Sequence, residues 1–131
     1  MTGLAAVVSL LALSGPSPAT LTVRYFDGTG PDHVSHLRCR ATSYRADGFL
    51  RDAGAGNACR RARTIAAFLD RAPRKDRICT QIYGGPQRGR ITGTIGDRTV
   101  DRRFKRTDGC AIGDWQYAVP LLPRIRAGRE P

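Results

Sequence analysis

The spacing of its four cysteines constrains this chain more than any other feature of the sequence. Cys39, Cys59, Cys79 and Cys110 are separated by 20, 20 and 31 residues. A structural zinc site needs closely spaced pairs such as Cys-x-x-Cys, because a short loop aims two thiolates at one ion. These gaps therefore argue against zinc and against a cytosolic redox motif, and no cofactor is expected. An even number of cysteines behind an export signal predicts two disulfides, for which the sequence leaves three pairings open.

The export signal is predicted at the amino terminus. Residues Gly3 to Leu13 form an apolar stretch of signal-peptide length that is too short to cross a bilayer. Small residues at Ser17 and Ala19 fit a peptidase site, and cleavage after Ala19 would leave 112 of the 131 residues. No Lys or Arg precedes the apolar stretch, so a truncated start, or a buried strand or helix, is the alternative. We expect a secreted, extracellular protein with a signal peptide at 1–19, one domain at 20–122 and a basic disordered tail at 123–131, and no membrane contact after cleavage.

The chain is strongly basic, with 22 Lys and Arg against 11 Asp and Glu and a net charge of +11. Such a balance is compatible with nucleic-acid binding, because basic residues on one face release counterions from phosphates. The arginines are nevertheless spread along the chain, and only Arg60, Arg61, Arg63 and the segment 71–77 approach a patch. We therefore expect no specific nucleic-acid partner. A secreted basic protein that binds nucleic acid or an acidic surface, without inhibitory activity, is the alternative function.

Short runs of alternating polarity predict an antiparallel sheet. A first strand at Leu21–Phe26 is followed by a turn and by a partner strand at His33–Arg40, in which Val34 falls out of phase and predicts a bulge or a late start. The stretch Thr42–Asn57 is rich in glycine and is predicted to be a long loop held by Cys59. A hairpin from Arg88 to Phe104 is predicted around a Gly96-Asp97 turn. Its two inner faces carry Ile91 with Ile95, and Val100 with Phe104.

Two helices complete the predicted fold. Asn57 can cap a helix whose apolar residues recur at three- and four-residue spacing and which Pro73 would end. These apolar residues are Ala58, Ala62, Ile65, Ala66 and Leu69. A short helix at Ile112–Val119 carries Trp115 and ends at Pro120. The predicted class is α+β, one domain in which an antiparallel sheet of about five strands packs against one main helix and a short second helix.

The segment Ile78–Pro86 is neither helical nor cleanly alternating. It has Cys79 at its base, Tyr83 after that cysteine, and a Gly84-Gly85-Pro86 exit that sets the chain direction. A loop tethered in this way is held extended and exposed, which is the conformation that a protease cleft accepts.

On these residues the chain resembles the Streptomyces subtilisin inhibitor family of serine protease inhibitors. The matching motifs lie between Leu21 and Leu122, and they are Leu37-Arg38-Cys39, Ala58-Cys59, Cys79-x-x-x-Tyr83, Phe104 after the hairpin, and Asp108-Gly109-Cys110. The resemblance implies disulfides Cys39–Cys59 and Cys79–Cys110. It also implies a homodimer built through the sheet, a non-enzymatic role, and a serine endopeptidase of subtilisin type as the partner.

The resemblance further implies a rigid, substrate-like reactive loop formed by Cys79, Thr80, Gln81, Ile82 and Tyr83. It places the scissile bond between Gln81 at P1 and Ile82 at P1′. The chain departs from the family at Thr80, where Pro is usual, and at Gln81, where Met, Lys or Arg is common. A trypsin-type pocket gains no ion pair from an amide, so subtilisin-type targets are predicted over trypsin-type ones.

Other functions find less support. His33 and His36 have Asp32 and Ser35 beside them in sequence, but adjacent strand residues point to opposite faces, which argues against a catalytic pair. The only glutamate is Glu130, which argues against a ribonuclease with a Glu base.

Two interpretations without a target protease stay open. Trp115 and Tyr117 could form a stacking surface, although core packing is favoured for Trp115. The loop from Cys79 to Tyr83 could also be an ordinary disulfide-anchored connection.

Overall fold

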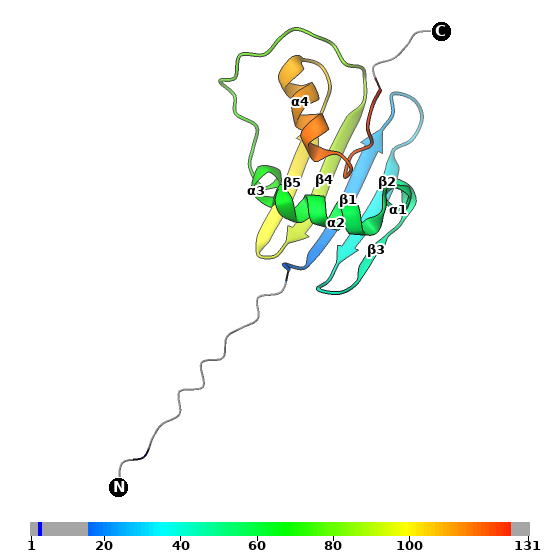
Figure 1. Cartoon of the computed structure of the whole chain (residues 1–131). Helices are drawn as coiled ribbons and strands as arrows, with labels where there is room; N and C mark the ends of the chain where they lie inside the picture. The colour runs from blue at the N-terminus through cyan, green and yellow to red at the C-terminus, as the bar shows by residue number, and fades with distance from the viewer. Residues whose placement is uncertain (1–2, 4–15, 127–131) are drawn as a thin grey trace.

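The computed structural model describes residue 3 and residues 16–126 as five antiparallel strands and four helices (Figure 1). The strands are β1 (Ala19–Phe26), β2 (His33–Cys39), β3 (Tyr44–Ala46), β4 (Arg88–Ile95) and β5 (Arg98–Phe104). The helices are α1 (Gly48–Ala53), α2 (Ala55–Thr64), α3 (Ala66–Leu69) and α4 (Gly109–Ala118). The sheet order is β3-β2-β1-β4-β5. The predicted α+β class, with its antiparallel sheet and two disulfides, is confirmed.

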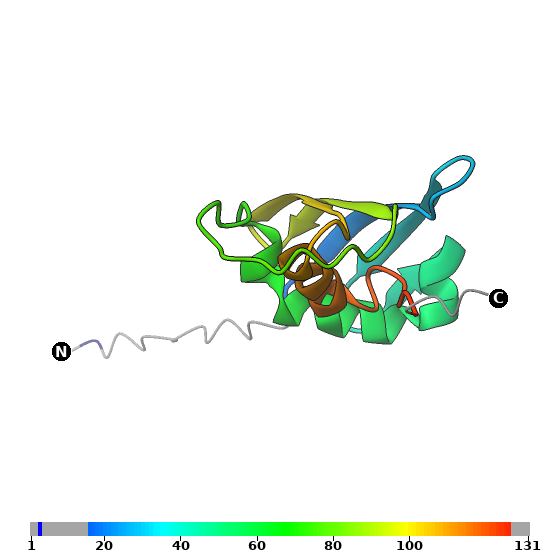
Figure 2. The same ribbon diagram turned by 90° about the horizontal axis from the view of Figure 1, so that it is seen from above.

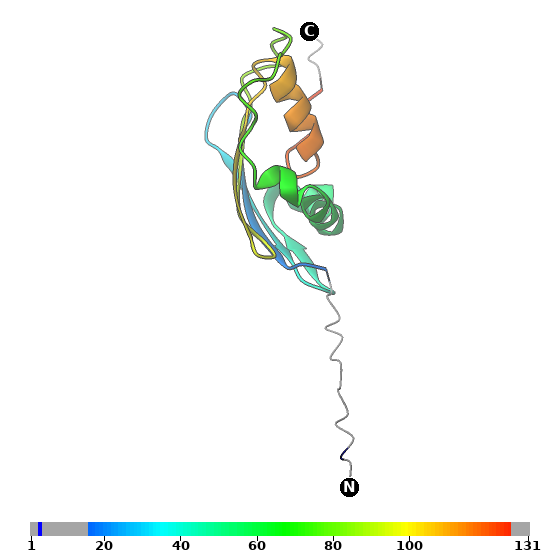
Figure 3. The ribbon, with the colours of Figure 1, turned by 90° about the vertical axis from the view of Figure 1, so that its left-hand side faces the viewer.

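All four helices lie on the same face of the sheet, and the opposite face is left uncovered (Figures 2 and 3). The core lies between the sheet and the helices, because alternate strand residues point toward the helices. Leu21, Val23 and Ile91 are buried there against Leu50 of α1 and Trp115 of α4. The Trp115 ring is fully buried and its Nε1 donates to the Pro123 carbonyl at 2.8 Å, which confirms its core role.

The predicted strands agree with the observed sheet. β1 pairs with β2, the predicted partner strand, and β4 pairs with β5 around the Gly96-Asp97 turn. Gly96 has φ +60°, in the region that favours glycine at such a turn. The inner faces of this hairpin carry the four predicted apolar residues, all of them buried.

The predicted irregularity in β2 is wrong. The β1–β2 register runs without interruption from Tyr25 opposite His33 to Ala19 opposite Cys39. Val34 is out of phase because Ser35 takes the core-facing position, where it is fully buried. The Ser35 hydroxyl accepts a hydrogen bond from the Leu50 amide at 3.4 Å. This buried polar side chain therefore bonds to a backbone amide in the first turn of α1.

The predicted long loop at Thr42–Asn57 is also wrong. This stretch contains β3, α1 and the start of α2. Leu50 explains the difference, because its full burial gives the short helix an apolar contact that outweighs the surrounding glycines. Gly54, rather than Asn57, stands at the N-cap of α2, and Asn57 lies inside the first turn.

The main helix ends earlier than predicted. α2 stops at Thr64, Ile65 separates it from α3, and α3 ends at Leu69 rather than at Pro73. The expected apolar positions Ala58, Ala62, Ile65 and Leu69 are buried. The last helix begins three residues earlier than predicted, because the Asp108 carboxylate accepts from the Ala111 amide at 2.8 Å and caps α4.

The folded part extends slightly beyond the predicted domain at both ends. Ala19 is the first residue of β1 and is buried, and the Pro18 carbonyl accepts from the Gly96 amide at 2.7 Å. At the other end, Ile125 still packs against the core. Residues 1–2 and 4–15 of the predicted signal peptide, and 127–131 of the predicted tail, lie outside the described residues. Within the described part of the chain, no helix is long and apolar enough to span a bilayer.

Candidate reactive loop

Residues 70–87 join α3 to β4 without forming a helix or strand. In Figure 1 this segment arches over the upper end of α4, where that helix begins. Residues 81–83 at its centre are solvent-exposed, and Ile82 and Tyr83 expose 61% and 65% of their surface. Ile78, which begins the predicted loop segment but was not among the predicted reactive-site residues, is fully exposed. The structure therefore adds one exposed apolar side chain on the amino-terminal side of Cys79.

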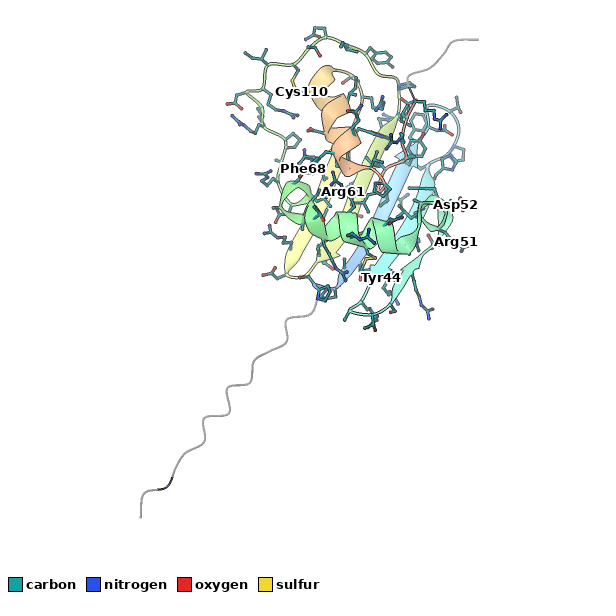
Figure 4. All side chains as sticks on the ribbon, in the orientation of Figure 1. Tyr44, Arg51, Asp52, Arg61, Phe68 and Cys110 are labelled. Carbon is teal, nitrogen blue, oxygen red and sulfur yellow. A yellow bond between two sulfur atoms is a disulfide. The ribbon has the colours of Figure 1, made fainter. Side chains whose placement is uncertain are left out.

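A disulfide between Cys79 and Cys110 anchors the base of the loop, with its Cα atoms 5.3 Å apart. Cys110 is the second residue of α4 and lies directly below the arch (Figure 4). The other disulfide, Cys39–Cys59, joins β2 to α2 inside the core. Cys39–Cys59 and Cys79–Cys110 are the two disulfides that the resemblance implies. All four cysteines are consumed in these bonds, so none is a free thiolate for a metal ion.

Backbone hydrogen bonds hold the loop on both sides of its exposed centre. The Thr80 carbonyl accepts from the Gly109 amide at 2.9 Å, and the Gly84 amide donates to the Arg106 carbonyl at 2.7 Å. Residues 81–83 therefore lie between two fixed points, one at Gly109 at the start of α4 and one at Arg106 just before it. This arrangement restricts the conformations open to the loop before any partner binds.

Two glycines permit this close approach. A Cβ on Gly109 would collide with the Thr80 hydroxyl, and a Cβ on Gly84 would lie 2.8 Å from the Ile112 side chain. Both positions therefore exclude larger residues without a shift of the loop. In the sequence, Gly109 stands out only as part of a cysteine motif, because its contact with Thr80 is made across 29 residues of chain.

Arg106 supports the carboxyl-terminal side of the loop from inside the protein. Only 5% of its surface is exposed, and its Nε donates to the Gly84 carbonyl at 3.2 Å. Its guanidinium lies 5.6 Å from the Trp115 ring centre. Burial lowers the pKa of Arg106 from its ordinary value. The sequence offered no sign of this role, because the residue lies among other basic residues at the end of β5.

Asp114 of α4 supports the amino-terminal side of the loop. Its two carboxylate oxygens accept from the Arg77 guanidinium at 3.0 and 2.9 Å, and one of them also lies 3.4 Å from Nη2 of Arg102. The hydrogen bond to Asp114 raises the pKa of Arg77. Because Arg77 lies two residues before Cys79, this ion pair fixes the approach to the exposed segment.

Arg102 holds the point where the loop leaves α3. Its side chain is 4% exposed, its Nη1 donates to the carbonyls of Phe68 and Arg71 at 2.8 and 2.6 Å, and its guanidinium stacks 4.2 Å from the Phe68 ring centre. Burial lowers the pKa of Arg102, and the nearby Asp114 carboxylate opposes that effect. Arg102 thus lies on the inward face of β5 with Val100 and Phe104, and it places a charge inside the protein.

The histidines do not form a catalytic group. His33 and His36 pair with Asp27 and Asp47 at 3.1 and 2.9 Å on the surface, whereas Ser35 points into the core between them. Tyr117 is partly exposed, and it packs against Phe68 and Arg61 rather than beside an exposed Trp115. The stacking surface considered from the sequence is therefore not assembled.

The basic residues that the sequence singled out as a near-patch are partly engaged within the fold. Arg61 donates through Nε and Nη2 to the Tyr117 carbonyl at 3.0 and 2.6 Å. Arg63 donates to the carbonyls of Ser17 and Arg40 at 2.9 and 3.2 Å. These two guanidiniums tie α2 to neighbouring segments, and Arg60 beside them is exposed.

Comparison with known proteins gives one similar solved structure. No protein-family model matches the chain, and no curated protein matches it. The chain is similar to sermetstatin from Streptomyces caespitosus, in a crystal structure of its complex with subtilisin from Bacillus licheniformis. The sequence identity is 22%, the TM-score is 0.44, and the alignment covers 84% of this chain and 100% of the sermetstatin chain.

Proposed function

We propose that this protein inhibits serine endopeptidases of subtilisin type by presenting Cys79–Tyr83 as a substrate-like loop, with Gln81–Ile82 as the scissile bond. The observation that carries the proposal is the exposed segment 81–83 between two anchored points, the Thr80 carbonyl and the Gly84 amide. A loop that is already extended loses little conformational entropy on docking, so its contacts appear as affinity.

The same anchors account for inhibition rather than digestion. If a protease serine attacks the Gln81 carbonyl, the new amino terminus at Ile82 stays in place, because the Gly84 amide and carbonyl are both bonded to Arg106. The acyl side is held by the Cys79–Cys110 disulfide and by the Thr80 carbonyl. Religation of the bond then competes with release of the fragments.

The exposed side chains favour a broad, apolar cleft as the target. Gln81 is neutral and offers no ion pair to a trypsin-type pocket. Ile78 and Ile82 add apolar surface on either side of it, and both are exposed. We therefore assign subtilisin-type targets over trypsin-type ones.

Secretion and dimerisation belong to the same proposal. Two disulfides are characteristic of extracellular and other oxidising compartments. A signal peptide at the amino terminus would deliver the chain there, and the burial of Ala19 in β1 favours cleavage before this residue instead of the predicted cleavage after it. The homodimer through the sheet stays a prediction of the resemblance.

The decisive experiment titrates subtilisin with the purified protein and follows residual activity. We expect stoichiometric inhibition, and a nick between Gln81 and Ile82 in the mass spectrum of long incubations. Gln81→Gly and Ile82→Pro should weaken inhibition by at least about tenfold, since each changes the residues at the reacting bond. Arg60→Gln, on the exposed side of α2, is the matched control and should leave inhibition unchanged. Cleavage elsewhere, or stronger inhibition of trypsin than of subtilisin, would overturn the assignment.

A further inference from the structure

We propose that the uncovered face of the sheet binds single-stranded nucleic acid through an arginine cluster made by Arg24, Arg88, Arg90 and Arg103. This function is independent of the reactive loop, and it competes with any homodimer that would cover the same face of the sheet. The cluster is distinct from the basic segments that stand out in the sequence, because its members come from three different strands.

The strand register lines up three of these arginines. Arg24 of β1 lies directly opposite Arg90 of β4, and Arg90 lies directly opposite Arg103 of β5. Neighbouring strands are about 4.8 Å apart, so three positive charges stand in one row across the sheet. Like charges placed directly opposite one another destabilise a sheet. A row of this kind is therefore unfavourable for the isolated fold and favourable for binding an anionic polymer.

The carboxylates of the protein neutralise little of this charge. Arg90 forms a bidentate pair with Asp101, with both nitrogen–oxygen distances 2.9 Å. Among residues 16–126, the other three arginines of the cluster have no carboxylate within ion-pair distance, and all three are exposed. These three guanidiniums remain available to an external anion.

The cluster surrounds a shallow hollow of about 300 Å³ on the uncovered face. Its lining includes the four arginines, Phe26 and one carboxylate, that of Asp32. The guanidinium fork donates two parallel hydrogen bonds to a phosphate, so a hollow with three arginines that lack a carboxylate partner on its rim suits phosphodiester oxygens.

Two features favour a single strand of nucleic acid over other anions. The Phe26 ring is half-buried beside the row, with the Arg88 guanidinium stacked 4.9 Å from its centre. Aromatic rings and guanidinium planes on a basic surface stack the bases of single strands without sequence preference. The adjacent row on the same face pairs Thr22 with Thr92, and hydroxyl groups of this kind bond to phosphate and sugar.

The test measures fluorescence anisotropy of a labelled oligothymidylate of about 20 nucleotides with the full chain, over a series of salt concentrations. The cluster variant is Arg24→Gln, Arg88→Gln and Arg103→Gln, which spares the Arg90–Asp101 pair. Loss of three phosphate contacts should raise the dissociation constant at least about tenfold and reduce the salt slope by about 2, since each contact to a single strand contributes about 0.7.

The matched control removes the same charge from other surfaces through Arg51→Gln, Arg60→Gln and Arg124→Gln, all exposed and off the sheet. It should change the dissociation constant less than about threefold. Circular dichroism and thermal melting establish that both variants are folded. Equal weakening by the two variants would show that net charge alone binds the oligonucleotide, and it would overturn the site. Displacement by dextran sulfate at a lower charge concentration than unlabelled oligonucleotide would overturn the assignment to nucleic acid.

Discussion

At the scale of single residues, Asp114 links the core to the exposed loop. Its carboxylate is shared by Arg77 of the loop and by Arg102, which is almost fully buried. Removal of one partner from such a group leaves a buried charge without compensation. The loop approach and the α3 end are therefore coupled through one side chain of α4.

We predict that Asp114→Asn lowers the free energy of unfolding by about 2 to 3 kcal/mol and also weakens subtilisin inhibition. The expected loss is below the range for fully enclosed pairs because Arg77 is partly exposed. Urea denaturation measures the stability. Asp101→Asn, which breaks the exposed pair with Arg90, is the control and should cost less than about 1 kcal/mol. Equal losses for the two variants would contradict the role assigned to Asp114.

Asp47 provides a prediction about pH. Its carboxylate accepts from the His36 amide at 2.6 Å and pairs with the His36 ring at 2.9 Å. The backbone hydrogen bond, followed by the bond to the ring, lowers the pKa of Asp47. The folded state therefore keeps Asp47 ionised where the unfolded state takes up a proton. Its contribution is fully present above the ordinary aspartate pKa and is lost as the pH falls through the lowered value.

We expect Asp47→Asn to be less stable than the wild type near neutral pH, and the difference to shrink at about pH 2. Urea denaturation at the two pH values measures it. Asp52→Asn is the control on the neighbouring helix α1 (Figure 4), because Asp52 forms no side-chain hydrogen bond among the described residues. A difference that grows toward acid would contradict the assigned direction of the Asp47 pKa.

At the scale of elements, the two disulfides have different tasks. Cys39–Cys59 joins the buried sides of β2 and α2, whereas Cys79–Cys110 joins the loop to α4. Each closes a chain segment of 20 or 31 residues, so each restricts the unfolded chain to a similar extent. Only the second one constrains the residues next to the proposed scissile bond.

Replacing either pair of cysteines by serine should cost on the order of 3 kcal/mol of stability. Below the melting temperature of both variants, we expect Cys79→Ser with Cys110→Ser to lose most subtilisin inhibition, and Cys39→Ser with Cys59→Ser to retain it. Inhibition constants and cleavage rates at residue 81 give the comparison. A similar loss of inhibition in both variants would assign the effect to global stability instead of to the loop.

At the scale of the whole molecule, the two faces of the sheet differ in charge and in covering. The helices protect one face (Figure 3). The other face carries the arginine cluster. A homodimer built through the uncovered face would bring two such clusters together. Their repulsion is screened as the ionic strength rises.

The dissociation constant of a dimer formed through this face should therefore increase as salt is lowered from about 300 mM to about 50 mM. Sedimentation equilibrium measures it. The variant Arg24→Gln, Arg88→Gln and Arg103→Gln should associate more tightly than the wild type at low salt, whereas the control variant at positions 51, 60 and 124 should not. Tighter wild-type association at low salt would place the interface elsewhere.

The sequence by itself determined the features that depend on neighbours along the chain. Alternating polarity predicts β1, β2 and the β4–β5 hairpin, because the side-chain period of a strand is local. Apolar spacing predicts the buried positions of α2. The region around Cys79 stands out because a non-periodic segment with a cysteine and a Gly-Gly-Pro exit is itself a local pattern.

Only the tertiary structure decided which distant residues meet. Leu50 turns a glycine-rich stretch into α1 because the core offers it a site, and Ser35 faces inward because α1 begins beside it. Asp114 reaches Arg77 across 37 residues. The row of Arg24, Arg90 and Arg103 exists because the pairing register of three strands sets it. The Gly96-Asp97 turn already places Arg90 opposite Arg103, whereas the register of β1 against β4 is fixed only by the packing of their shared inner face, because no turn joins these two strands.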